Sequence, residues 1–505
     1  METMKRRTYA SSITTSVLGL ALIGLAACSA GDDTTGVLTP EGSAGFSGPI
    51  AFVNNAGDKT LMSLALKGDS GNAVINTIPA AEFENVALGD MQYSSGDWFF
   101  MNLGDANKVA TIDPLTGATP QHEVNLPAGT RPVHIYRDAN NGEVLWTMND
   151  GDNASGTTTP GDDLVNCAPL GQAGGSVTVM HNSHLGPGAN PPTVLRTTCI
   201  LADGHKVAAF SSGAGVPQRA FVSSTTAGEI AVIDDQEGSP TYLQMIHRID
   251  LCNSAKEAGL QSPAVCDQEN ATGTTRFSPN NSGPHGIRWS KLTKKIYSYQ
   301  EGYQEIAEID PTTFDIKTFD LAQTPYTGFG ISPDGRFLLL RGDTTPSTGT
   351  KLGVIDLGTA GTPRTDFTIP ELDGTSTGAF KFSPDGKRFY ILAGNAAAST
   401  KKDRLFAFDA STLTATSPAL TLLSEIQLIP GGDSAGFNAA HNMDVLVQGA
   451  GEAKFIVVSN RAAQSVSIIN ATDNVMKQTV QVGTSPGAVL VYQSGAAAAG
   501  NQASN

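Results

Sequence analysis

The segments GISPDGRFLLL (residues 330–340) and KLGVIDL (residues 351–357) decide the fold of this chain. The Ser-Pro-Asp-Gly turn joins two apolar runs, because proline presets its φ angle and glycine supplies the positive φ that a hairpin turn needs. The same order recurs as KFSPDGKRFYIL (residues 381–392) followed by RLFAFDA (residues 404–410). Such units, with about four short strands in a period of about 40–50 residues, are typical of β-propeller blades.

Six further, more degenerate copies (called the worn copies below) extend this repeat over most of the chain. Together with the two clear copies they predict an all-β protein with one propeller of about eight blades, with seven blades as the alternative. The repeat overrides the roughly three domains that the chain length alone would suggest. The worn copies carry the strand-like segments AFVNN (51–55), WFFMN (98–102), VLWTM (144–148), AFVSS (220–224), KIYSY (295–299) and FIVVSN (455–460).

The two ends of the repeat predict how the ring closes. PGAVLVY (residues 486–492) has the pattern of an innermost strand with no blade after it, and IAFV (residues 50–53) that of a second strand with no innermost strand before it. Pairing these N- and C-terminal strands completes one blade and removes two open strand edges. We therefore expect a β-propeller over residues 49–493 and a frayed tail over residues 494–505.

The N-terminus indicates export. Basic residues at positions 5–7 precede an apolar run over residues 17–27, which is too short to span a bilayer but fits a secretory signal. The run ends in Leu-Ala-Ala-Cys28, which resembles the lipobox of bacterial lipoproteins. The resemblance implies a signal peptide over residues 1–27 and acyl chains such as palmitate on Cys28. An ordinary signal peptide with a chance cysteine is the alternative.

The same resemblance implies a location. Two or three acyl chains anchor a protein stably in a membrane, and Ser29 in place of aspartate favours sorting to the outer membrane in Gram-negative members of the family. Residues 28–48 are small and polar, as in a flexible stalk. We expect a cell-envelope protein whose partners are the membrane, through the lipid, and an envelope protein or metal ion.

The charge of the chain excludes one class of partner. The formal net charge is −16, and the expected signal peptide carries a net +2, so the mature chain would carry −18. Such acidity argues against nucleic acid as a partner.

Four cysteines remain after Cys28, an even count that predicts two disulfides in an exported protein. Three pairings are possible, and the local pairs are favoured because each closes an insertion. These pairs are Cys167–Cys199 and Cys252–Cys266. The chain has no CxxC motif, so thiol redox chemistry has no support.

The Phe-Val-Asn-Asn, Val-Val-Ser-Asn and Ser-Pro-Asp-Gly segments resemble the bacterial YVTN-type propeller repeat. The resemblance covers most of residues 49–493. It implies the fold, whereas propellers host many unrelated activities.

Two sequence motifs of catalysis are absent. The chain has no HExxH motif and no phosphate-binding glycine loop. This favours a non-catalytic binding protein, which handles metal or serves as a scaffold for protein partners. The alternative is a lactonase-like hydrolase, because propellers of related repeat type resemble lactonases.

Histidines are the strongest candidates for a site. Four of the eight lie near the start of expected innermost strands, namely His134, His205, His285 and His441. Innermost strands converge on the propeller axis, so these side chains are expected to meet at one mouth of the channel. Imidazoles in this number suit zinc or copper, with Asp444 or Asp203 completing or orienting the site. The alternative is a hydrated channel lined by polar residues.

The order of Pro-Val-His, Gly-His, a cysteine-rich segment, Pro-His-Gly and a late histidine is similar to periplasmic zinc-chaperone propellers of the AztD type. The resemblance implies zinc binding by His134, His205, His285 and His441. The chain is longer than those proteins, has a lipobox, and lacks a His-rich N-terminal arm, which puts a soluble delivery role in doubt.

Three further features have a mainly structural interpretation. His181 and His184 could form a peripheral metal site, but a solvated pair is the simpler interpretation. The acidic stretch over residues 149–155 lacks the bidentate glutamate of a calcium loop. His122 and His247 are expected in outer strands.

Overall fold

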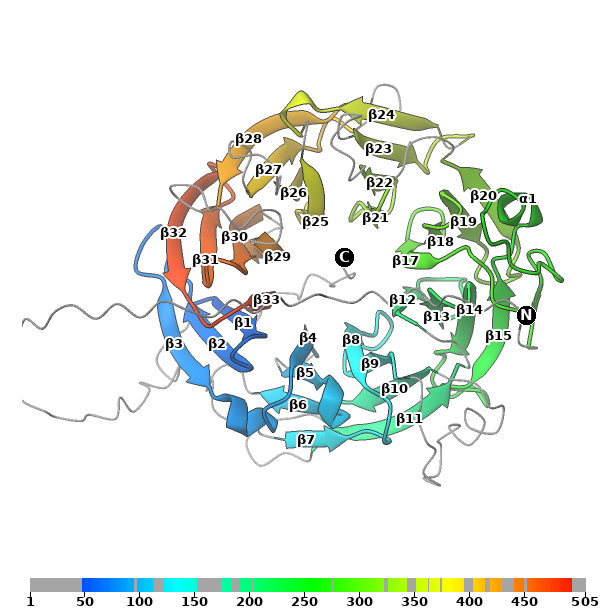
Figure 1. Cartoon of the computed structure of the whole chain (residues 1–505), viewed down its shortest axis with the longest axis horizontal. Helices are drawn as coiled ribbons and strands as arrows, with labels where there is room; N and C mark the ends of the chain where they lie inside the picture. The colour runs from blue at the N-terminus through cyan, green and yellow to red at the C-terminus, as the bar shows by residue number, and fades with distance from the viewer. Residues whose placement is uncertain are drawn as a thin grey trace, which may run out of the picture. The chain divides into compact units, whose positions relative to one another are not determined.

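The chain forms a ring of eight antiparallel sheets, a β-propeller, in the computed structural model (Figure 1). Both the all-β class and the blade number predicted from the repeat are confirmed. The structure describes residues 48–492 except 95–97, 113–121, 152–174, 184–190, 201–203, 275–276, 322–325, 343–350, 362, 373–374, 395–402, 414–417, 429–439 and 449–451. The expected signal peptide, Cys28, the stalk and the tail lie outside the described residues.

Blades are numbered along the chain, and each runs from its innermost strand outward. Blade 1 contains β33 (Pro486–Tyr492), β1 (Ile50–Asn55), β2 (Thr60–Ala65) and β3 (Ala73–Ile78). Blade 2 contains β4 (Leu88–Tyr93), β5 (Phe99–Leu103), β6 (Lys108–Ile112) and β7 (His122–Asn125), and blade 3 contains β8 (Pro132–Arg137), β9 (Val144–Asn149), β10 (Ser176–His181) and β11 (Thr193–Cys199). Blade 4 contains β12 (Lys206–Ser211), β13 (Arg219–Ser224), β14 (Glu229–Asp234), β15 (Met245–Asp250) and a short fifth strand, β16 (Thr272–Gly273).

The second half of the ring repeats this order. Blade 5 contains β17 (Pro284–Ser290), β18 (Lys295–Gln300), β19 (Glu305–Ile309) and β20 (Ile316–Asp320), and blade 6 contains β21 (Gly328–Ile331), β22 (Phe337–Arg341), β23 (Lys351–Asp356) and β24 (Arg364–Thr368). Blade 7 contains β25 (Ser376–Phe382), β26 (Arg388–Gly394), β27 (Arg404–Asp409) and β28 (Thr421–Gln427), and blade 8 contains β29 (Ala440–Gln448), β30 (Glu452–Asn460), β31 (Ser465–Asn470) and β32 (Val475–Gln481). The short helices are η2 (Ala80–Phe83), η3 (Gly104–Ala106), α1 (Ser254–Glu257) and η5 (Pro370–Leu372).

The ring closes as the two ends of the repeat predicted. Strand β33 pairs antiparallel with β1, with Tyr492 opposite Ile50 and Val489 opposite Val53. The last strand of the chain is thus the innermost strand of the first blade, and it covers the inner edge of β1, which would otherwise be open.

The core lies between neighbouring blades. Every side chain of β1 and β14 is buried, because these strands are covered on both faces. Phe52 of blade 1 stacks on Phe99 of blade 2 with ring centroids 4.6 Å apart, and Trp146 of blade 3 meets Phe210 of blade 4 at 5.5 Å. Outermost strands such as β24 alternate between exposed and half-buried residues. Continuous apolar runs in the sequence therefore mark middle strands, and alternation marks outer ones.

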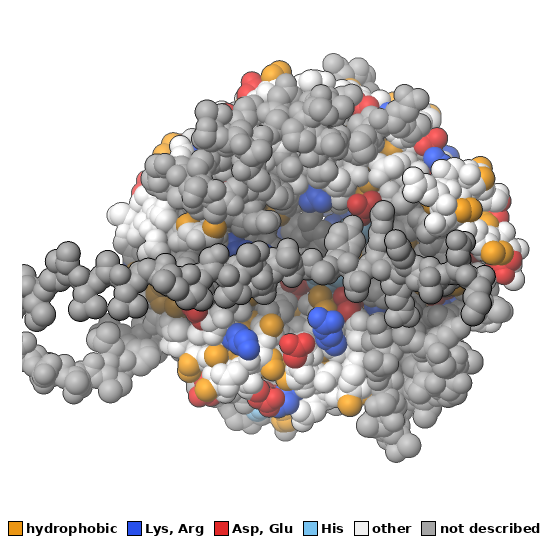
Figure 2. All heavy atoms as spheres, in the orientation of Figure 1, with side chains coloured by type: hydrophobic (Ala, Val, Ile, Leu, Met, Phe, Trp, Pro, Cys, Tyr) orange, Lys and Arg blue, Asp and Glu red, His pale blue; other side chains and the backbone are white. Residues whose placement is uncertain are grey.

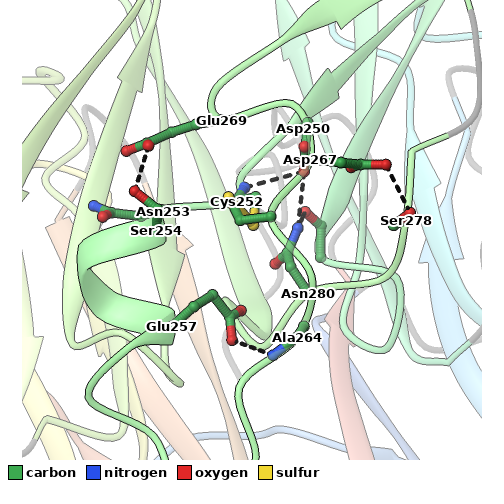
Figure 3. The surroundings of a disulfide bond; sticks show 12 residues. Asp250, Cys252, Asn253, Ser254, Glu257, Ala264, Asp267, Glu269, Ser278 and Asn280 are labelled. Carbon is green, nitrogen blue, oxygen red and sulfur yellow. Dashed lines mark hydrogen bonds between the residues drawn. A yellow bond between two sulfur atoms is a disulfide. The ribbon is translucent and has the colours of Figure 1, made fainter.

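An insertion between β15 and β17 is held by the predicted disulfide Cys252–Cys266 (Figure 3). Asp250 accepts a hydrogen bond from the Cys252 amide at 3.0 Å and one from Asn280 at 2.8 Å. The Glu257 carboxylate, at the end of α1, accepts one from the Ala264 amide at 2.7 Å. These bonds fix the insertion on both sides of the disulfide.

The structure also bears on the second disulfide, on two outer-strand histidines and on membrane-spanning helices. Cys199 is disulfide-bonded, and its predicted partner Cys167 lies outside the described residues. His122 and His247 lie in β7 and β15, the expected outer strands. None of the helices that the structure describes is long and apolar enough to cross a membrane.

Candidate functional site

Several innermost strands carry a β-bulge close to their start. The pairing register shifts at His285 in β17, at His441 in β29 and just before His134 in β8. His285 and His441 therefore occupy equivalent backbone positions in blades 5 and 8. Bulges redirect side chains and are frequent next to functional sites.

Two of the predicted histidines meet at the channel mouth where the innermost strands begin. Nε2 of His134 in blade 3 lies 2.8 Å from Nε2 of His205, which directly precedes β12 in blade 4. Their ring centroids are 4.5 Å apart, and the rings stand nearly edge to face. The sequence separation is 71 residues, so the propeller geometry alone brings them together.

A third imidazole lies beside this pair. The ring centroid of His285 in blade 5 is 5.6 Å from that of His205. The convergence of three of the four predicted histidines is thus found in the structure. The side chain of His441 lies outside the described residues. On the face drawn in Figure 2, acidic and basic side chains lie beside the central opening.

Two of the three rings have a carboxylate bonded to Nδ1, and the third has a carboxylate nearby. His134 Nδ1 bonds to Asp90 of β4, and His205 Nδ1 lies 2.9 Å from Oδ2 of Asp150, directly after β9. His285 Nδ1 lies 3.6 Å from Glu301, directly after β18. The two bonds orient Nε2 of His134 and of His205 away from the carboxylates.

The local charges act differently on two of the rings. Burial opposes protonation of His134, but the Asp90 carboxylate outweighs it and raises the pKa of His134 above its usual value. Burial, with the neighbouring His205 and the Arg341 guanidinium, lowers the pKa of His285 to about 4. His285 is therefore neutral at physiological pH, with a lone pair available.

With both neighbouring carboxylates ionised, the His134–His205 contact favours a positive charge between the rings. If each Nδ1–H donates to its carboxylate, each neutral ring presents the lone pair of Nε2. Two lone pairs 2.8 Å apart repel each other unless a cation lies between them. A shared proton satisfies this geometry, and so does a metal ion that separates the two nitrogens slightly.

The described side chains do not form a ready-made metal cage. Among them, no group of three or more His, Cys, Asp or Glu residues is arranged to hold a metal ion. A metal ion would require small ring movements, and the donor set of imidazole nitrogens backed by carboxylates fits zinc or copper in its chemistry.

Other candidate residues lie elsewhere. Asp444 is buried in β29, where its Oδ1 accepts from Lys381 Nζ at 2.5 Å and its Oδ2 accepts from the Val491 amide at 2.7 Å. The structure thus places Asp444 in an ion pair and not beside the three histidines. His181, at the end of β10, has its Nε2 3.3 Å from Oε2 of Glu143. His184 and Asp203 lie outside the described residues.

Sequence reasoning missed the three carboxylates that lie beside the rings. Asp150 lies in the acidic stretch that was weighed as a calcium loop, and its Oδ1 also accepts from the Lys206 amide at 3.3 Å. Asp90 lies within the irregular pairing between Leu88 and Met91 at the start of β4. The signal that could have found it is the blade repeat itself, since Asp90 follows the start of an innermost strand as His134 does.

Comparisons with known proteins show the fold and leave the function open. No protein-family model and no curated protein matches the sequence. Apo AztD from Citrobacter koseri is similar over 88% of this chain and 98% of that chain, with a TM-score of 0.53 and 12% identity. The periplasmic gluconolactonase PpgL from Pseudomonas aeruginosa is similar over 88% and 98%, with a TM-score of 0.45 and 13% identity. At such identities the chain is similar to these proteins in being a propeller, and binding and lactone hydrolysis both stay open.

Proposed function

We propose that this protein is a non-catalytic binding protein of the bacterial cell envelope. It holds a zinc ion at the channel mouth through His134, His205 and His285, and copper is the second candidate metal. The observation that carries the proposal is the approach of His134 Nε2 and His205 Nε2 to 2.8 Å. Both rings are backed at Nδ1 by a carboxylate, which favours a cation, either a proton or a metal ion, between the two nitrogens.

The required rearrangement is small. Two nitrogens bound to one tetrahedral zinc ion at about 2.0–2.1 Å are about 3.3 Å apart. The two Nε2 atoms would move apart by roughly half an ångström from 2.8 Å. His285 supplies the third donor, and water or His441 the fourth.

The surroundings support an exchangeable ion. The side chains of His134, His205 and His285 keep 13%, 30% and 35% of their exposure, so an ion can reach them from solvent. Carboxylates on Nδ1 fix the tautomer of a ligand histidine and raise its basicity. The likeness of the histidine order to AztD-type zinc-chaperone propellers agrees with this assignment.

The envelope location rests on the lipobox at Cys28 and on the disulfide chemistry. Disulfides persist in oxidising compartments outside the cytoplasm, and Cys252–Cys266 is formed. A lipid on Cys28 would keep the propeller at a membrane surface, where it would retain metal locally.

The test is elemental analysis of protein purified without chelator, followed by calorimetric titration with zinc and with copper. We expect about one equivalent of zinc in the wild type and negligible uptake in a His205→Ala, His285→Ala double variant. A His122→Ala, His247→Ala double variant removes two histidines from outer strands and is expected to bind like the wild type. Equal, negligible uptake by all three proteins would overturn the metal assignment. Lactone hydrolysis that is abolished by a channel substitution would overturn the non-catalytic one.

A further inference from the structure

A cavity of about 550 Å³ lies at the other end of the channel, where the innermost strands end. The wall is formed by later residues of the innermost strands of blades 3, 4, 5, 6, 7 and 8. The Ser-Pro-Asp-Gly turns of blades 6 and 7 also line it. A volume of about 300–1,000 Å³ is typical of pockets for small molecules. The zinc proposal does not use this cavity.

Basic side chains outnumber acidic ones in the cavity wall. Arg137 at the end of β8 is half-buried, and its guanidinium makes no hydrogen bond or ion pair with the residues that the structure describes. Lys291, directly after β17, adds an exposed ammonium group, and Arg288 lies buried with its guanidinium 5.5 Å from the Phe329 ring. Burial lowers the pKa of Arg137, and it lowers the pKa of Arg288 to about 10, so both stay charged at neutral pH.

The acidic side chains of the wall already have partners. Asp444 pairs with Lys381 at 2.5 Å. Asp138 accepts from the Trp146 indole at 2.9 Å and from the Asn140 amide at 2.6 Å. Burial and the nearby Asp138 carboxylate raise the pKa of Asp235 far above its usual range, so this carboxyl pair carries one negative charge. Four basic groups thus face two negative charges in a chain of net charge −16.

Much of the remaining wall is apolar and aromatic. Phe380 and Phe382 of β25 and Trp289 of β17 line the cavity. Gly330 is needed for this wall, because a Cβ atom there would lie 2.5 Å from the Phe380 ring. A partly desolvated cation beside aromatic walls favours a ligand that has both an anionic group and an apolar body.

We propose that this cavity binds a small organic anion, with its charged group at Arg137 and Lys291 and its apolar body against Phe380 and Phe382. The ligand charge compensates the uncancelled positive charge of the wall. The aromatic rings distinguish such a ligand from an inorganic anion.

The test uses the fluorescent probe 8-anilinonaphthalene-1-sulfonate and its uncharged analogue N-phenyl-1-naphthylamine on the full protein. We expect Arg137→Gln to weaken sulfonate binding by roughly tenfold or more, because a charge-assisted hydrogen bond is lost. The same variant should bind the uncharged probe like the wild type. Arg131→Gln removes an exposed guanidinium that pairs with Asp105 before β8, and it is expected to leave both affinities unchanged.

Further arms separate charge from apolar contact. Phe382→Ala should weaken both probes, and benzoate should displace the sulfonate probe at concentrations where inorganic phosphate does not. Equal sulfonate binding by wild type and Arg137→Gln would overturn the proposal, as would displacement by phosphate as effective as by benzoate. Circular dichroism of each variant confirms that it is folded.

Discussion

Replacing Asp90 with asparagine isolates the role of the carboxylate behind His134. The Asp90 side chain is 41% exposed and bonds to His134 Nδ1, so Asp90→Asn removes one negative charge without opening the core. Loss of a carboxylate that orients a ligand histidine costs about 10–100-fold in metal affinity. We expect zinc affinity to fall by at least about tenfold at pH 8, which corresponds to about 1.4 kcal/mol.

The pH dependence gives this prediction a second readout. Asp90 raises the pKa of His134 above its usual value, so protons compete with zinc at a higher pH in the wild type than in Asp90→Asn. The difference in affinity between the two proteins should therefore shrink as the pH falls from 8 to 6. In metal-free protein the effect of Asp90 on the free energy of unfolding has the opposite pH dependence and is largest at low pH. A raised histidine pKa stabilises the fold below the unfolded-state pKa, and this contribution disappears as pH rises through the folded-state pKa.

The assay is competition for zinc with a chromophoric chelator at pH 6, 7 and 8. Asp105→Asn is the matched control, since Asp105 is 66% exposed and contacts Arg131 instead of a histidine. Urea unfolding of metal-free protein at pH 5.5 and 8 checks the sign, with an expected loss in Asp90→Asn of up to about 1 kcal/mol at the lower pH only, because the pair is partly exposed. Equal zinc affinity of Asp90→Asn and wild type at pH 8 would refute the role of Asp90.

Three other perturbations test the fold and the location. A chain that ends at Ser485 lacks β33 and exposes the edge of β1, so it should aggregate in size-exclusion chromatography, whereas a chain that ends at Tyr492 should remain a monodisperse propeller; normal elution of the shorter chain would contradict the closure. Arg248→Met removes the cation from the fully buried Arg248–Glu229 pair and should lower the free energy of unfolding in urea by about 3–5 kcal/mol. Arg364→Met, in a partly exposed pair, should lower it by less than about 1 kcal/mol. Equal losses would refute the argument from burial. Cys28→Ser should abolish acylation measured by mass spectrometry of the envelope fraction, and a wild-type protein without acyl chains would exclude the lipid anchor.

The sequence was sufficient for the fold because the signals are local and repeated. The Ser-Pro-Asp-Gly turns fix the hairpins of blades 6 and 7, and the apolar runs mark strands that are buried on both faces. The closure by β33 was also predictable, because the two unfinished ends of the repeat complement each other. The short spacing of Cys252 and Cys266 likewise indicated the pair that the structure contains.

The candidate site was predictable only in part. Equivalent positions in successive blades point at one axis, which is why His134, His205 and His285 could be grouped from their place in the repeat. Asp444 lies three residues beyond His441, which moves it about 10 Å along a strand. It therefore reaches Lys381, in the wall of the cavity at the other end of the channel. Asp90, Asp150 and Glu301 depend on bulges and turns, and on how neighbouring blades sit against each other, which no local pattern encodes.

X-ray absorption at the zinc edge, on protein loaded with one equivalent of zinc, tests the central claim most directly. The account predicts at least three imidazole nitrogens around zinc at about 2.0–2.1 Å, without sulfur. It also predicts that this spectrum is lost in the His205→Ala, His285→Ala double variant. Zinc surrounded by oxygen alone, or a spectrum unchanged in the double variant, would contradict a metal site at the channel mouth.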